Sequence, residues 1–242
     1  MLARRNGIGP GTMKTIGLIG GLSWESSAVY YRLINEEARR RLGGLRSARS
    51  LMFSFDFGEV EALQAEGRWD EAARLMAEAG ASLARGGADF LLICSNTMHR
   101  MAAEVEDAAG IPLLHIADPT AEALRRAGVT RVGLLGTAFT MEHDFYKGRL
   151  RDRWGIEALV PGASARAEVH RVIYEELVRG RVEEASRAVY REVIAGLGAE
   201  GAQAVILGCT EIMLLVRPGD SPLPVYDTTT LHALAAVERA LA

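Results

Sequence analysis

Short apolar runs alternate along this chain with longer stretches in which apolar residues recur at a helical spacing. Between the runs, residues 26–42, 69–85, 121–127, 167–178 and 182–197 have apolar positions about 3.6 residues apart, as in amphipathic helices. The runs have the length of buried strands and lie at 15–20, 50–55, 89–94, 111–116, 131–136, 156–160, 204–209 and 223–227. This alternation predicts an α/β fold with mostly parallel sheets.

Segments of the first half recur in the same order in the second half. TIGLIGG resembles RVGLLGT, ADFLLICSNT resembles AQAVILGCTE, and IPLLHIADPTAEAL resembles PLPVYDTTTLHAL. Gly17 and Gly133 are 116 residues apart, and Ser95 and Cys209 are 114 apart. We interpret this recurrence as a duplicated α/β unit. The alternative is that all buried parallel strands have similar sequences.

The duplication predicts two pseudo-symmetric three-layer α/β/α units with a cleft between them. We expect the first domain to comprise 13–117 plus about 220–242, and the second about 118–219. Residues 1–12 are rich in glycine and polar residues and are expected to be a disordered extension, which leaves Met1 and Met13 as alternative starts.

Composition and charge exclude several classes of function. With 28 basic and 31 acidic residues, the net charge of −3 offers no basic field for nucleic acid. No apolar run approaches the roughly 18 residues that cross a membrane, and the first residues lack the apolar core of a signal peptide. Two cysteines without an export signal favour free thiols in a reducing cytoplasm.

Two further classes of site are not favoured by the motifs. The five histidines and two cysteines show no metal-ligand spacing, so we expect no metal. The segment GLIGGLS is rich in glycine but is not a GxGxxG dinucleotide motif.

Candidate chemistry gathers where two predicted strands end, in LLICSNTMH and VILGCTEI. Ligands of open α/β sheets bind beyond the carboxyl ends of strands. Each segment leads into a predicted helix, whose first N–H groups would bind an anion and favour a thiolate. Two facing units would then place a potential base on each wall of the cleft.

Several motifs together resemble the aspartate/glutamate racemase superfamily, most closely its bacterial amino-acid racemase branch. They are IGLIGGLSWESSAVYYRLIN, CSNTMH, LHIADPTAEAL, GLLGTAFTMEHDFYKGRL, IYEEL, GAQAVILGCTEI and LPVYDTTTLHA, from about Met13 to the C-terminus. The resemblance implies two pseudo-symmetric domains and exchange of the α-proton of a small amino acid by two bases. It also implies that neither pyridoxal phosphate nor a metal is needed. Members of the superfamily are often dimers, so a homodimer is one option for this chain.

The resemblance assigns the two bases unequally. Cys209 matches the cysteine of the second-domain base. The first base in the wider superfamily is a cysteine directly before Asn-Thr, and here Ser95 holds that position. Cys94 precedes it and would face the opposite side of the strand, either completing the core or acting as the base instead. His99 either helps to activate Ser95, which is a poor base alone, or caps a helix.

Substrate-binding candidates surround these bases. Gln64 lies near the region where aspartate-specific relatives place an arginine, and no arginine occurs from 54 to 64, which puts specificity for aspartate or glutamate in doubt. His170 is a weaker candidate that could equally lie on the surface. The others are Ser23, Asn96, Thr97, Thr137, Thr210 and Glu211, each with a capping role as the alternative.

Two other functions stay open at this stage. A decarboxylase or cis–trans isomerase of small dicarboxylates could use Cys209 alone. A non-catalytic amino-acid binding protein could have kept the cleft and lost the first base. The sequence does not identify the amino acid or the oligomeric state.

Overall fold

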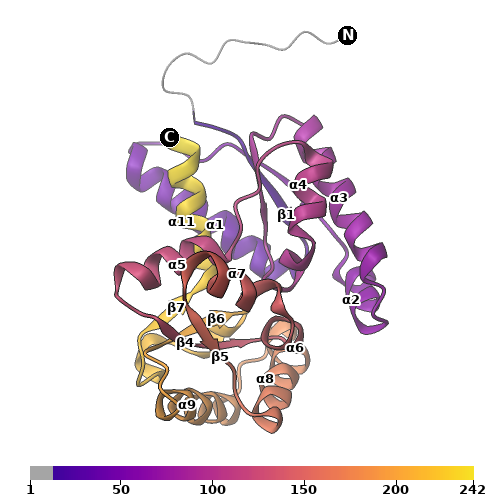
Figure 1. Ribbon diagram of the computed structural model, residues 1–242. Helices are drawn as coiled ribbons and strands as arrows, with labels where there is room; N and C mark the ends of the chain where they lie inside the picture. The colour runs from indigo at the N-terminus through magenta and orange to yellow at the C-terminus, as the bar shows by residue number, and fades with distance from the viewer. Residues whose placement is uncertain (1–12) are drawn as a thin grey trace, which may run out of the picture.

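Two parallel sheets, each between layers of helices, form two lobes in the computed structural model, which describes residues 13–242 (Figure 1). The extension expected over 1–12 lies outside the described residues. The first sheet has the strand order β2-β1-β3 and the second has β5-β4-β6-β7. The α/β fold with parallel sheets predicted from the sequence is therefore confirmed.

The first lobe is built on β1 (Ile16–Gly20), β2 (Ser50–Ser54) and β3 (Phe90–Ile93). Its helices α2, α3 and α4 cover one face of the sheet, and α1 covers the other. Their bounds are α1 (Trp24–Leu42), α2 (Phe57–Ala65), α3 (Trp69–Arg85), the 3₁₀ helix η1 (Thr97–Met101) and α4 (Ala102–Ala109).

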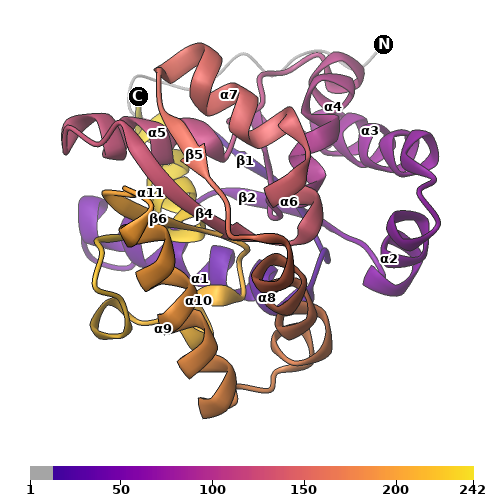
Figure 2. The ribbon, with the colours of Figure 1, turned by 60° about the horizontal axis from the view of Figure 1, so that its bottom comes forward.

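The second lobe is built on β4 (Arg131–Gly136), β5 (Glu157–Leu159), β6 (Ala204–Gly208) and β7 (Val225–Asp227). Figure 2 shows α8 and α9 on one side of this sheet and α5 and α7 on the other. The bounds are α5 (Ala117–Arg126), α6 (Ala138–Glu142), α7 (Asp144–Trp154), α8 (Ala163–Glu175), η2 (Leu177–Arg179), α9 (Glu184–Ala199), α10 (Ile212–Leu215), η3 (Pro218–Asp220) and α11 (Thr228–Leu241).

Each lobe is completed by a helix that follows the sheet of the other lobe. After the first sheet, α5 packs into the core of the second lobe, and after the second sheet, α11 packs against α1 in the first (Figure 1). The sequence treated about 220–242 as one piece of the first domain. The structure divides it, because β7 pairs with β6 in the second sheet while α11 buries its apolar face on the first.

Some predicted elements differ from those observed. The run 111–116 forms a single bridge, Leu91 to Leu113, because the chain turns into α5 directly afterwards. Helix α7 was not predicted from the apolar pattern, because most of its residues are charged. Only Tyr146, Gly148 and Leu150 are buried. Helices α2 and α11 were also not predicted.

Candidate active site

A small cavity of about 30 Å³ lies between the two lobes. The first lobe contributes the residues after β3, and the second contributes those after β6, so equivalent strand ends meet across it. Eight candidates from the sequence line this cavity: Gln64, Ser95, Asn96, Thr97, Thr137, Cys209, Thr210 and Glu211. The remaining lining residues are Leu22, Phe57, Ile173, Tyr174, Val178 and Gly208.

The Cys209 thiol is held against a buried carboxylate. Its Sγ donates to Glu211 Oε2 over 3.0 Å, and Glu211 is only 3% exposed. Burial raises the pKa of the Cys209 thiol well above its usual value, and the neighbouring Glu211 carboxylate raises it further. The thiol is therefore protonated at rest, and its proton points at a group that can accept it.

The Glu211 carboxylate also joins the two lobes. It accepts hydrogen bonds from Thr210 Oγ1 at 2.8 Å and from Ser26 Oγ of α1 at 2.5 Å. Ser26 in turn is held by Ser23, which caps α1 by accepting the Ser26 N–H at 3.2 Å. Ser23 thus lies behind the cavity, outside its lining, while Ser26, which sequence reasoning missed, reaches the carboxylate.

Cys94 and Ser95 face opposite ways at the end of β3, as an extended strand requires. Cys94 is fully buried among apolar residues of the first lobe, and this burial raises the pKa of its thiol. Ser95 is partly exposed and lines the cavity. The position of Cys94 supports its alternative role in the core.

His99 holds the backbone of Ser95 and not its hydroxyl. Its Nδ1–H donates to the Ser95 carbonyl oxygen at 2.7 Å, and its Nε2 accepts the Ile116 N–H at 3.1 Å. Burial lowers the pKa of His99 well below its usual value, and the nearby His115 and His232 lower it further. With both ring nitrogens engaged, the neutral ring has no group left to activate the Ser95 hydroxyl, contrary to one expectation from the sequence.

Hydroxyl and amide groups complete the polar side of the cavity. Thr97 Oγ1 lies 2.9 Å from Thr137 Oγ1, which links the two lobes. Asn96 Nδ2 donates to Thr228 Oγ1 at 3.0 Å, whereas the buried Asn96 Oδ1 has no hydrogen-bond partner within 13–242. This oxygen is therefore a buried acceptor whose hydrogen-bonding capacity is unmet.

Gln64 and Tyr174 meet across the cleft. The Tyr174 hydroxyl, from α8, donates to Gln64 Oε1 over 2.9 Å, and Gln64 Nε2 lies 3.0 Å from Met98 Sδ. His170 is one turn back on α8, outside the cavity lining. Its Nδ1 accepts the Ala138 N–H at 3.1 Å and its ring lies 4.7 Å from that of Tyr174. Tyr174 was not predicted, because nothing in its local sequence distinguishes it from a core aromatic.

A helix follows each of the two strand ends, as expected from the sequence. The segment after β3 begins as the 3₁₀ helix η1 and continues directly into α4, and the segment after β6 forms the four-residue α10. Backbone N–H groups of Thr210 and Glu211 still point at Cys209 and favour its thiolate. At Cys209, the electrostatic contribution is therefore that of a tight turn followed by a four-residue helix.

Neither a metal-binding cluster nor a membrane-spanning helix is found within residues 13–242. These residues contain no group of three His, Cys, Asp or Glu side chains placed to hold a metal ion. None of their helices has the length and apolar character needed to span a bilayer.

Comparison with known proteins places this fold and cavity in a class. The model of the Asp/Glu/hydantoin racemase family matches residues 19–236. A protein of Yersinia pestis, solved as a candidate Asp/Glu racemase, is 51% identical, with a TM-score of 0.89 over 95% of this chain and 100% of the other. An aspartate racemase homologue from Pyrococcus horikoshii OT3 is 32% identical, with a TM-score of 0.81 over 94% and 99%.

A curated relative points the same way. The broad specificity amino-acid racemase RacX of Bacillus subtilis is 23% identical over 184 residues, 72% of this chain and 74% of RacX. The chain belongs to the Asp/Glu/hydantoin racemase family and is therefore a racemase, an isomerase by reaction class.

Proposed function

We propose that this protein is a cofactor-independent amino-acid racemase that exchanges the α-proton of its substrate between Cys209 and Ser95. The observation that carries the proposal is the shared cavity to which matching strand ends of the two lobes bring a thiol and a hydroxyl. Inversion of a carbon needs one proton donor or acceptor on each face. The family match and the racemases among its relatives support this reaction over a single-cysteine decarboxylase, a cis–trans isomerase or a binding protein.

The polar side of the cavity suits the two groups that every amino acid shares. The unpartnered Asn96 Oδ1 would accept a hydrogen bond from the ammonium group. The hydroxyls of Thr97 and Thr137 would donate to the carboxylate. These donors would also stabilise the enolate that forms when the α-proton leaves, since its extra charge develops on the same oxygens.

The hydrogen bond from Cys209 to Glu211 indicates where the thiol proton goes. The thiol first transfers its proton to Glu211, and the resulting thiolate takes the α-proton from Cα. The Ser95 hydroxyl delivers a proton to the opposite face of Cα and recovers one from water. The hydroxide left by this step takes the proton held by Glu211, which restores water and the resting state of all three side chains. The reverse sequence serves the other enantiomer.

The two bases differ in strength, which gives the proposal a kinetic signature. A serine hydroxyl is a far weaker base than a thiolate. Among residues 13–242, no charged side chain is hydrogen-bonded to the Ser95 hydroxyl, and the neutral His99 holds only the Ser95 backbone. We therefore expect the α-proton of one enantiomer to exchange faster than that of the other.

Proton NMR in deuterated water tests the reaction. Each enantiomer of a panel of amino acids is incubated separately, and loss of the α-proton signal is followed together with chiral chromatography. Cys209→Ala is expected to slow α-proton exchange by about 10² to 10⁴-fold or more, because it removes a catalytic base. Decarboxylated or cis–trans products, or binding with no exchange in the wild type, would refute the proposal.

Location and assembly remain part of the proposal. The two free, buried thiols support a reducing cytoplasm. Exposed apolar side chains on α1 and on the edge strand β2, among them Trp24, Tyr31 and Phe53, support association of two copies. Sedimentation equilibrium would give the mass of a dimer; a monomer at micromolar concentration would contradict this assembly.

A further inference from the structure

We infer that the substrate carries a neutral side chain, and that this racemase discriminates against aspartate and glutamate. The inference rests on the proposed function and deepens it by naming the class of substrate. It starts from the charges around the cavity. Glu211 is the one charged side chain among the fourteen residues that line it, and no lining residue is arginine, lysine or histidine.

The cavity lining contains two chemically different sets of groups. Hydroxyl, amide and thiol groups are contributed after β3, β4 and β6, and the α-carbon and its substituents would lie against them. The apolar part of the lining, called the apolar wall below, comes from Leu22, Phe57, Ile173, Val178 and the ring of Tyr174. With the ammonium and carboxylate held by the polar groups, the substrate side chain would contact this apolar wall.

A second carboxylate would have no cation to pair with here. The amide of Gln64 is a donor that contacts Tyr174 of the wall, but its oxygen already accepts from Tyr174 and its nitrogen contacts Met98 Sδ. A neutral amide also binds a carboxylate more weakly than a bidentate guanidinium. The buried Glu211 would further repel a distal carboxylate, so burial of that group would be uncompensated.

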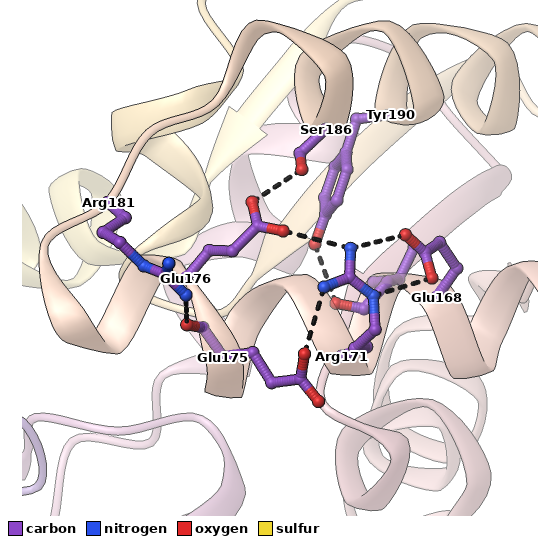
Figure 3. A network of polar contacts seen from close by, with 8 residues as sticks. Glu168, Arg171, Glu175, Glu176, Arg181, Ser186 and Tyr190 are labelled. Atoms are coloured by element: carbon purple, nitrogen blue, oxygen red, sulfur yellow. Dashed lines mark hydrogen bonds and ion pairs between the residues drawn. The ribbon is translucent and has the colours of Figure 1, made fainter.

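Neither arginine beside this wall in the sequence lines the cavity. Arg179, directly after Val178, is exposed, and Arg171 is paired elsewhere. Arg171 is three residues before Tyr174 on α8, and Figure 3 shows its guanidinium bound by carboxylates. It pairs with Glu168 at 2.7 Å, with Glu175 at 3.1 Å and with Glu176 at 3.0 Å. Moving it to the cavity would break three ion pairs at once.

The same network holds the apolar wall in place. Glu176, which is 8% exposed, accepts from Ser186 Oγ at 2.6 Å and so ties the end of α8 to α9 (Figure 3). The Tyr190 hydroxyl donates to the Val169 carbonyl at 3.0 Å. These contacts therefore hold in place the end of α8 and the turn after it, which carry Ile173, Tyr174 and Val178. We expect these contacts to keep the wall in place when a ligand binds.

The decisive experiment compares charged and neutral substrates of the same shape. The α-proton exchange rates of L-aspartate and L-asparagine, of L-glutamate and L-glutamine, and of L-leucine and L-methionine are measured with the wild-type protein. We expect kcat/KM for each neutral amino acid to exceed that of its charged isostere by at least about 100-fold, as for an unpaired buried charge. Comparable or faster exchange of aspartate or glutamate would overturn the inference and leave the proposed function standing.

Two variants at one position give a matched control. Gln64→Arg supplies the missing cation, and we expect it to raise glutamate relative to glutamine exchange by at least tenfold. Gln64→Met is neutral and of similar length, and we expect it to keep the wild-type preference. Circular dichroism confirms folding, and if Gln64→Arg does not fold, the wild-type comparison decides alone. Absence of exchange with every amino acid would instead refute the proposed function itself, and the inference with it.

Discussion

Replacement of Glu211 by glutamine separates the carboxylate's chemical role from its structural one. The carboxylate receives three hydrogen bonds, from Cys209 and Thr210 on one oxygen and from Ser26 on the other. In the Glu211→Gln variant, the amide oxygen can replace the first oxygen, and the amide NH₂ can donate to the Ser26 hydroxyl. Shape and contacts are retained, so we expect stability to fall by only about 1 kcal/mol.

The loss in activity should be much larger than the loss in stability. An amide cannot accept the thiol proton, and the Cys209 thiol, whose pKa burial already raises, would stay protonated. Loss of a general base slows exchange by about 10² to 10⁴-fold. At about 1.36 kcal/mol per factor of ten, this corresponds to about 3 to 5 kcal/mol in activation free energy.

The assay is the initial rate of α-proton exchange, measured by NMR together with thermal unfolding for each variant. Ser26→Ala is the matched control, because it removes one hydrogen bond to the same carboxylate and leaves its charge. We expect a loss of less than tenfold for this control. A folded Glu211→Gln variant that exchanges within threefold of the wild type would refute the assignment of the thiol proton to Glu211.

Two further predictions concern groups outside the cavity. Cys94→Ala should reduce stability by about 1 to 2 kcal/mol, since it leaves a small void in the core, and should change exchange less than twofold; a folded variant without exchange would contradict this. Burial lowers the pKa of His232 to about 4, so below about pH 6.5 the unfolded chain binds more protons. The free energy of unfolding should then fall toward pH 4, by up to about 1.4 kcal/mol per pH unit for this group. Denaturant titrations at several pH values should show that this free energy falls less steeply with pH in His232→Gln. An equally steep fall in the variant would argue against this assignment.

The amino-acid sequence by itself determined most of the strands and the position of the site. Apolar runs specify buried parallel strands, and the change to polar residues after Ile93 and Gly208 marks where those strands end. The alternation of a strand also predicted that Cys94 and Ser95 face opposite sides. These features are local, because they depend only on the two-residue period of an extended chain.

Only the tertiary structure decided which groups act on one another. Ser26 and Glu211 are 185 positions apart, and Gln64 and Tyr174 are 110 apart. The partners of His99, the exchange of α5 and α11 between the lobes, and the lack of a cation in the cavity likewise depend on how the two sheets pack. Periodicity tells which face of an element is buried, but not which distant residue meets it there. For this reason the sequence was enough to propose Cys209 and Ser95 as the bases, whereas the three-dimensional packing decided that Glu211 is hydrogen-bonded to Cys209 and which side chains line the cavity.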